Sequence, residues 1–346
     1  MTSILTNNSA TIALQTLRTI NAGLDTTSNR VSTGQRISSA ADGAAYWAIA
    51  ATLKSDNGSL SALKDAMSLD KNSVDAASAG LNKVIDQLSA VKNALTSAAS
   101  GGSDKSKLQN DITVALNAIK NFSDNTVMNG SNWLSVKSDD TGFSATKNLV
   151  AAYSRIGSTV SVSRTVLDTS SFVLYDSKAN ASAGGAGAKA AALTAIAASA
   201  TDASGYTVTV KADTTGPAVN YQKGFMDTQY TINASTTGVS VASMNITTVG
   251  DDQKMISAYM KIVDATAQQL LTGASVLGSM STLLKSQQDF TQQLMDINTS
   301  SIGSLVDANI EEESTKLKAL QTQQQLGVQA LSIANSSSQN VLSLFR

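Results

Sequence analysis

From Tyr46 to Ala98 an apolar residue recurs at every third or fourth position, and only Asp56 and Asp70 interrupt the series. A spacing of about 3.5 residues kept over such a length is typical of a coiled-coil helix, because it holds one seam towards a partner. The pair Gly101 and Gly102 predicts the end of this helix. The apolar positions are Tyr46, Ile49, Leu53, Leu60, Leu63, Met67, Val74, Ala77, Leu81, Val84, Leu88, Val91, Leu95 and Ala98.

Two more helices are predicted to pack beside the first one. A helix from about Lys105 to Asp124 follows a short glycine-containing link, so we expect it to fold back antiparallel. Its apolar face consists of Leu108, Ile112, Ala115, Ile119 and Phe122. A second long heptad pattern begins at Ile256 and is predicted to shift by one position near its end. Its positions are Ile256, Met260, Val263, Ala267, Leu270, Ala274, Leu277 and Leu284, then Leu283, Phe290, Leu294 and Ile297.

The middle of the chain, from about Ser138 to Gly250, has a different pattern. Its segments STVSVS and GYTVTV alternate polar with apolar residues, which predicts strands. An alanine- and glycine-rich stretch from Ala181 to Gly205 predicts at most a short helix. The sequence therefore predicts a mainly α fold with a β-containing insert, in which long antiparallel helices come from both chain ends.

Both terminal segments carry apolar heptads that continue almost to the chain ends. At the N-terminus these positions are Ala10, Ala13, Leu17, Ile20, Leu24 and Val31, with Thr27 as the polar exception. At the C-terminus they are Leu317, Leu320, Gln324, Gly327, Leu331, Ala334, Ser338, Val341 and Phe345. A second stripe lies one position away, at Leu326, Ala330, Ile333 and Leu344. One partner helix cannot cover both stripes, so a second interface is predicted.

The terminal helices are too thin to build a core of their own, so we expect them to be ordered by neighbouring copies of the chain. The alternative for any single stripe is an ordinary bundle core. The predicted self-assembly interface consists of Leu17, Ile20, Leu24, Arg30, Val31, Arg36, Leu317, Leu320, Leu326, Leu331, Ile333, Val341, Leu344 and Phe345.

Composition narrows the possible chemistry. The 346 residues include 25 Lys plus Arg against 26 Asp plus Glu, so no basic field is present to hold nucleic acid or an anionic membrane. The sequence has no Cys and no His, which removes the commonest nucleophiles, bases and metal ligands. We therefore expect no enzyme activity and no cofactor. The acid pairs Asp139–Asp140 and Asp251–Asp252 are read as turn or helix-cap residues rather than as catalytic carboxylates.

The N-terminal sequence has no charged region followed by an apolar core, and the chain has no long apolar run. Neither a signal peptide nor a membrane span is predicted.

Two terminal motifs together are specific enough to indicate a protein family. The segment RVSTGQRISSAADGAAYWAIA, Arg30 to Ala50, combines two arginines, a glycine turn and an alanine-rich helix start. Gly34 provides a permissive backbone, and Ser38 or Ser39 is expected to cap the helix whose first turn holds Asp42. The segment from Ser304 to Arg346 combines an acidic start, a Gln-rich middle and the ending ANSSSQNVLSLFR. With NGSNWL at Asn129 to Leu134, these motifs resemble bacterial flagellin over about 1–134 and 251–346.

The resemblance implies a structural subunit that self-assembles into the helical flagellar filament used for motility. It implies inner terminal helices at 1–42 and 305–346, an outer helical core at 43–137 and 251–304, and a variable surface domain at 138–250. Arg30 and Arg36 would bind carboxylates or carbonyls of a neighbour. The implied partners are copies of the chain, other flagellins, an export chaperone, hook-associated junction and cap proteins, and the type III export apparatus. The implied location is extracellular.

Two other readings remain open from the sequence. A flagellar hook–filament junction protein shares similar terminal helices. An intracellular coiled-coil scaffold or signalling protein would explain the heptads but not the terminal motifs. A metalloprotease insert would need a His-Glu-x-x-His helix, and the chain contains no His.

Overall fold

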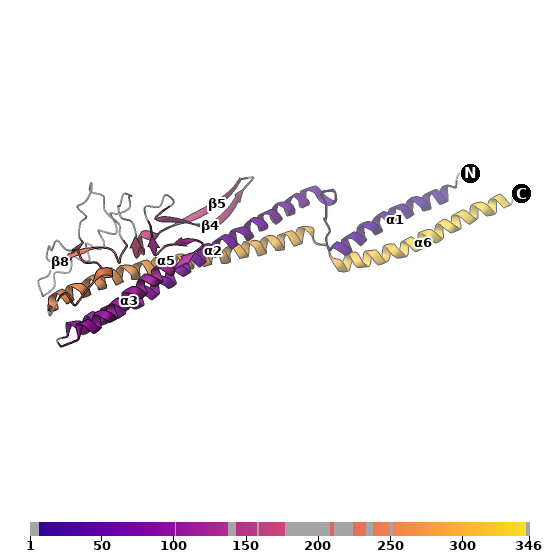
Figure 1. The fold of residues 1–346 in the computed structure, drawn as a ribbon. Coiled ribbons are helices and arrows are strands. Elements are labelled where there is room, and N and C mark those ends of the chain that lie inside the picture. Colours follow the sequence, from indigo (N-terminus) through magenta and orange to yellow (C-terminus); the bar gives the residue numbers. More distant parts are fainter. Residues whose placement is uncertain are drawn as a thin grey trace. The chain divides into compact units, whose positions relative to one another are not determined.

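The computed structural model describes residues 7–100, 102–137, 143–157, 159–176, 208–210, 224–232, 238–249 and 252–343, with side chains to 336 at the C-terminal end. The long helices are α1 (Asn8–Thr33), α2 (Ala40–Ala99), α3 (Lys105–Asn125), α5 (Gln253–Val306) and α6 (Ile310–Ser343). The strands between α3 and α5 are β1 (Val127–Met128), β2 (Ser131–Asn132), β3 (Ser135–Val136), β4 (Thr146–Ile156), β5 (Thr159–Asp168), β6 (Tyr175–Asp176), β7 (Val208–Val210) and β8 (Tyr230–Ile232). The predicted fold class, mainly α with a strand-containing insert, is confirmed (Figure 1).

The chain divides into two compact units, of which one combines the two ends of the sequence and the other is a continuous segment. We call Met1–Ser61 with Gln292–Arg346 the terminal unit and Ala62–Thr291 the middle unit. The terminal unit contains α1 and α6, the first part of α2 and the last part of α5. The middle unit contains the rest of α2 and α5, α3 and the strands.

In the middle unit α2 and α5 run antiparallel and form the predicted seam. Polar contacts fix this direction, since Lys92 pairs with Asp264 and Ser281 donates a hydrogen bond to Asp75. Met67, Val74, Leu81, Leu88, Leu95, Ile256, Val263, Leu270, Leu277 and Leu284 are all buried in it. The heptad prediction is confirmed for this part of both helices.

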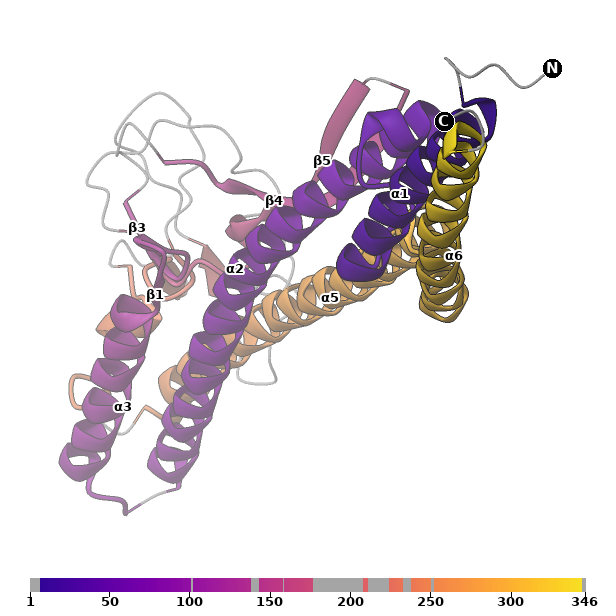
Figure 2. The ribbon, with the colours of Figure 1, turned by 90° about the vertical axis from the view of Figure 1, so that its right-hand side faces the viewer.

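The link to α3 also agrees with the sequence. Gly102 has a left-handed φ of 91°, and the Asp104 carboxylate accepts hydrogen bonds from the amides of Ser106 and Lys107 at the start of α3. Figure 2 shows α3 beside α2. Its buried residues are Ile112, Ala115, Ile119 and Ser123, whereas Phe122, predicted on the inner face, is 38% exposed.

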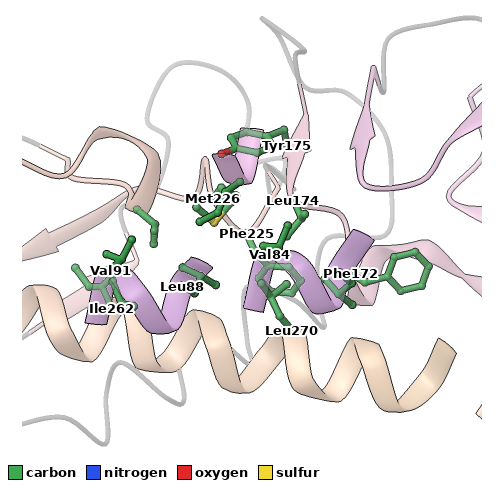
Figure 3. Packing of buried hydrophobic residues seen from close by; sticks show 14 of the residues in the cluster. Val84, Leu88, Val91, Phe172, Leu174, Tyr175, Phe225, Met226, Ile262 and Leu270 are labelled. Carbon is green, nitrogen blue, oxygen red and sulfur yellow. The ribbon is translucent and has the colours of Figure 1, made fainter. Parts of the chain in front are cut away.

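The described part of the insert belongs to the core of the middle unit. Figure 3 shows side chains of β6 and its neighbouring loops packed over α2 and α5. The buried residues that it contributes include Phe172, Leu174, Tyr175, Phe225 and Met226. Hydrogen bonds add to this packing, because Asp70 accepts from the Val150 amide at 2.7 Å and Gln109 accepts from the Ile246 amide at 2.8 Å. Asp70, which interrupts the apolar stripe of α2, therefore binds β4 through this hydrogen bond.

The predicted strands are confirmed in their described parts. β4 and β5 form an antiparallel hairpin with a register shift between Val150 and Ala152. β7 pairs antiparallel with β8. The alanine-rich stretch from Ala181 to Gly205 lies outside the described residues.

Two expectations for the helix seams are wrong. The shift on α5 does not occur: Leu283, Phe290 and Ile297 are 48%, 51% and 59% exposed. The original register continues instead through Thr291, which is buried. Its hydroxyl can be buried because it donates a hydrogen bond to the carbonyl of Gln287. A polar residue can thus occupy a seam position when its side chain bonds to its own helix.

The start of α2 also differs from the prediction. Tyr46 and Ile49 are 52% and 49% exposed, and Ala50 is the buried residue on that turn. Gly43 has non-helical backbone angles within α2, so the regular helix begins after it.

Candidate self-assembly interface

The two terminal helices, α1 and α6, lie side by side and antiparallel within the terminal unit (Figure 1). The predicted stripe of α1 and the first predicted stripe of α6 meet at this contact. Residues Ala10, Ala13, Leu17, Ile20, Leu24 and Val31 of α1, and Leu317, Leu320, Gln324, Gly327, Leu331 and Ala334 of α6, are partly covered. Thr27, the polar exception, is buried. The heptads therefore identified which face of each helix meets the other.

Glycines let the two helices approach closely. A Cβ added to Gly327 would lie 3.1 Å from Leu17 Cδ1, and one added to Gly23 would lie 3.6 Å from Leu320 Cδ1. The leucine side chains thus fill the space over the opposite glycines.

Three polar contacts along the helices fix the register of the pair. Asn7 Nδ2 donates to the Ala334 carbonyl at 2.9 Å, and Gln324 Nε2 donates to Asn21 Oδ1 at 2.8 Å. At the other end Arg30 Nη1 lies 3.0 Å from Glu313 Oε1. A slip of one turn would break all three contacts, so they specify one alignment.

Glu313 is a seam residue that the sequence analysis missed. It lies in the first turn of α6, where a carboxylate is favoured by the helix dipole. Its Oε2 atom is buried and has no hydrogen-bond partner among the described residues. The available signal was its position four residues before Leu317, which continues the C-terminal heptad.

The connections between the terminal helices and the longer helices are hydrogen-bonded to each other. Gln35 and Asp307 form an antiparallel bridge, and the Ala308 amide donates to the Gly34 carbonyl at 2.9 Å. Gly34 has a left-handed φ of 71°, as its predicted role as a permissive turn requires. Arg36 Nη2 donates to the Leu305 carbonyl at 2.9 Å. Both predicted interface arginines, Arg30 and Arg36, therefore have partners within their own chain.

The serines before α2 act differently from the prediction. Their side chains do not accept hydrogen bonds from the helix. Instead the amides and hydroxyls of Ser38 and Ser39 all donate to Asp42 Oδ2, at 2.9 to 3.1 Å. These bonds hold the pKa of the Asp42 carboxyl below its usual value, with the Ser39 amide as the largest cause. A carboxylate accepts several donors at once, so it organises this turn better than one hydroxyl would.

The second C-terminal stripe faces away from α1. Leu326 and Ile333 are 59% and 69% exposed, and Ala330 between them is exposed as well. Val341 lies on α6 beyond the described side chains, and Leu344 and Phe345 lie outside the described residues. Leu326 and Ile333 are therefore large aliphatic side chains of α6 that α1 leaves exposed.

Among the described residues, no group of three or more acidic side chains is placed to hold a metal ion. Asp252 caps α5 by accepting hydrogen bonds from the amides of Lys254 and Met255, as predicted, while Asp139, Asp140 and Asp251 lie outside the described residues. Within the described ranges, none of the helices combines the length and hydrophobicity that a membrane span requires.

Comparison with known proteins identifies the relatives of this chain. Residues 4–139 match the family described as the bacterial flagellin N-terminal helical region, and residues 260–345 match the bacterial flagellin C-terminal helical region. Flagellin C of Rhizobium meliloti (strain 1021) is 37% identical over 353 residues, covering all of both chains. Flagellin A of Rhizobium meliloti is 36% identical over 416 residues, again covering all of both chains. Flagellin of Brucella melitensis biotype 1 is 35% identical over 347 residues with the same full coverage.

Both family regions coincide with the helices that carry the heptads, and the likeness to whole flagellins continues through the insert. This agreement favours a filament subunit over a junction protein or an intracellular scaffold. The chain belongs to the bacterial flagellin family, whose members are the structural subunits of the flagellar filament.

Proposed function

We propose that the paired helices α1 and α6 form the inner layer of the filament and that the exposed stripe of α6 contacts neighbouring copies. In this arrangement residues 1–42 and 305–346 form the core, residues 43–137 and 251–304 surround it, and residues 138–250 face the solvent. The observation that carries the proposal is the exposure of Leu326 and Ile333 on a helix whose other apolar stripe is already covered by α1.

The proposed interface residues fall into three groups by their environment. Leu17, Ile20, Leu24, Val31, Leu317, Leu320 and Leu331 join α1 to α6 within one copy. Arg30 and Arg36 hold the ends of that pair in place through Glu313 and the Leu305 carbonyl. Leu326, Ile333, Val341, Leu344 and Phe345 are the residues that we assign to contacts between copies. The first two groups hold α1 and α6 together, and the third group forms the surface that contacts other copies.

We infer further that the protein has no catalytic activity and acts outside the cell as part of the flagellum. Its other partners would be co-polymerising flagellins, an export chaperone, hook-associated junction and cap proteins, and the type III export apparatus. The support is the likeness of both terminal segments to flagellins, together with the absence of His and Cys from the sequence.

Seeded polymerisation tests the proposed interface. The double variant Leu326→Gln, Ile333→Gln removes two apolar contacts, each worth about 1.5–3 kcal/mol when fully buried. The critical concentration should therefore rise by more than about tenfold. The control is Gln325→Ser with Ser332→Gln, which alters exposed polar positions of the same helix.

The control should elongate seeds like the unchanged chain, and circular dichroism should show equal helix content for all three proteins. An unchanged critical concentration for Leu326→Gln, Ile333→Gln would contradict the assignment of this stripe to contacts between copies.

A further inference from the structure

The dipeptide Asn-Gly occurs twice in the sequence, at Asn57–Gly58 and at Asn129–Gly130. In this dipeptide the backbone nitrogen of glycine can attack the side-chain amide carbon of the asparagine, because glycine has no side chain that hinders ring closure. The attack removes ammonia and converts the asparagine into an acid. The two sites have different surroundings, so the fold decides which of them reacts.

Asn57 lies inside α2, and both polar atoms of its side chain are bonded. Its Nδ2 atom donates to the Met295 carbonyl at 3.2 Å and to Thr299 Oγ1 at 3.0 Å. Its Oδ1 atom accepts a hydrogen bond from Asn298 Nδ2 at 3.0 Å. The helical backbone also commits the Gly58 amide to the hydrogen-bond ladder of α2. The fold therefore holds in place the two atoms that would have to meet.

Asn129 and Gly130 form the exposed two-residue turn between β1 and β2. Both residues have left-handed φ values, 52° and 72°, as in the type I′ turn that Asn-Gly favours. The ladder begins at the pair Met128 and Ser131, so the Gly130 amide lies outside it. The nitrogen that would attack is therefore not committed to strand pairing.

Ring closure also requires the peptide bond of this turn to rotate out of the turn conformation. The free energy of that opening is low, because β1 and β2 are joined by only two residue pairs, Val127 with Asn132 and Met128 with Ser131. A two-stranded ribbon of this length has little stability of its own. Short exposed segments open at a low free energy, whereas packed helices such as α2 open far less often.

The chain after the turn is held by the side chain of Asn132. Its Nδ2 atom donates to the carbonyls of Ser123 at 2.7 Å and Asp124 at 3.1 Å. Its Oδ1 atom accepts hydrogen bonds from the amides of Leu134 and Ser135, both at 2.9 Å. The turn can therefore open while the chain stays attached to the end of α3.

We propose that Asn129 is a site of spontaneous deamidation in the folded chain and that Asn57 is protected from this reaction. The Gly130 nitrogen forms a bond to Asn129 Cγ, the bond from Cγ to Nδ2 breaks, and Nδ2 leaves as ammonia with the proton of the Gly130 amide. Water then opens the five-membered succinimide. Breakage of the bond from nitrogen to Cγ gives aspartate, and breakage of the bond from nitrogen to the main-chain carbonyl carbon gives isoaspartate. Water replaces ammonia overall, and nothing is oxidised or reduced.

Both products change the turn. Each carries a negative charge where the asparagine side chain was neutral. Isoaspartate also adds one carbon to the backbone, which a two-residue turn cannot accommodate while the pair Met128 and Ser131 keeps its register. The reaction needs only one copy of the chain and water, so it is independent of the proposed assembly.

Incubation of the depolymerised full-length protein at mildly alkaline pH tests the proposal, since the attacking amide loses its proton more readily there. Mass spectrometry of the peptides that contain Asn57 and Asn129 measures the converted fraction at each site over time. We expect the rate at Asn129 to exceed that at Asn57 by more than about tenfold, which corresponds to about 1.4 kcal/mol in opening free energy. An isoaspartyl methyltransferase should label the Asn129 peptide.

The matched control is the same chain in concentrated urea, where both Asn-Gly pairs have lost their surroundings and should react at similar rates. The variant Asn129→Gln should lose the methyltransferase label in the folded chain, because glutamine would have to close a larger ring and does so far more slowly.

Equal rates at the two sites in the folded chain would overturn the proposal. A rate at Asn129 that is negligible beside its rate in urea would overturn it as well, because the turn would then protect the asparagine. A preference for Asn129 that persists unchanged in urea would contradict it too, since the neighbouring residues and not the fold would then decide the rate. None of these results bears on the proposed function.

Discussion

Arg30 Nη1 in α1 lies 3.0 Å from Glu313 Oε1 in α6, and both side chains are largely covered, at 28% and 11% exposure. The pair joins the end of the first terminal helix to the beginning of the last one. Its members are 283 positions apart in the sequence. The pair therefore holds α1 to α6 at the end where these helices connect to α2 and α5. Loss of one partner would leave the other charge poorly solvated.

Arg30→Ala should therefore destabilise the α1–α6 pair by about 2 kcal/mol, as expected for loss of a hydrogen bond between charged groups. The measurement is the dissociation temperature of the polymer, which should fall. Arg18→Ala removes an exposed arginine from the same helix and should have little effect. The exchanged pair Arg30→Glu, Glu313→Arg should recover part of the loss, whereas equal effects of Arg30→Ala and Arg18→Ala would refute a structural role for this contact.

The Asp42 turn predicts a dependence on pH. The pKa of the Asp42 carboxyl is lowered from 3.8 by hydrogen bonds from Ser39 and Ser38. A lowered pKa in the folded state means that the carboxylate contributes stability above pH 3.8, and that this contribution is lost as pH falls through the lower folded-state pKa. Asp42→Ala should lower the melting temperature at neutral pH, and the difference from the unchanged chain should shrink in strong acid.

Asp25→Ala, at an exposed position of α1, is the control for that titration. Its melting temperature should follow that of the unchanged chain at every pH. A difference between Asp42→Ala and the unchanged chain that persists at the same size in strong acid would show that Asp42 does not act through its charge.

Two glycines of α2 should respond to alanine in opposite directions. Alanine is favoured over glycine in a helix by about 0.5–1 kcal/mol. At Gly58 an added Cβ would meet nothing within 4 Å, so Gly58→Ala should be stabilising. At Gly80 it would lie 2.8 Å from Leu134 Cδ1 and also against Thr126, so Gly80→Ala should cost about 1–3 kcal/mol through overpacking. Chemical denaturation of both variants measures the difference, and stabilisation by Gly80→Ala would disprove the close approach of Leu134 to α2.

The sequence predicted the helices and their contact faces because spacing alone determines which side chains share a face. The seam of α1 and α6 follows from the heptads, including the buried position of Thr27. The one-residue shift on α5 was wrong because apolar residues at Leu283 and Phe290 were assumed to be buried. The structure instead places Thr291 in the seam and leaves those two residues exposed.

Contacts that depend on the alignment of distant segments were beyond the sequence analysis. Arg30 was expected to bind a neighbouring copy, but the antiparallel register of α1 and α6 brings Glu313 of the same chain to it. The same holds for Asp70, which looked like a defect in the stripe of α2 and in fact binds the Val150 amide. A polar interruption in a heptad can mark a tertiary contact, but its partner is set by the fold.

The central claim is that the C-terminal end of the chain joins one subunit to others, and seeded growth of a chain lacking Val341 to Arg346 tests it most directly. The deletion removes apolar side chains each worth about 1.5–3 kcal/mol on burial, a contribution that recurs with every subunit added. The outer helices lie far from the deleted residues in sequence, so thermal unfolding of the monomer should be unchanged. We predict that this monomer stays soluble and does not elongate filament seeds; elongation at the rate of the full chain would contradict the claim.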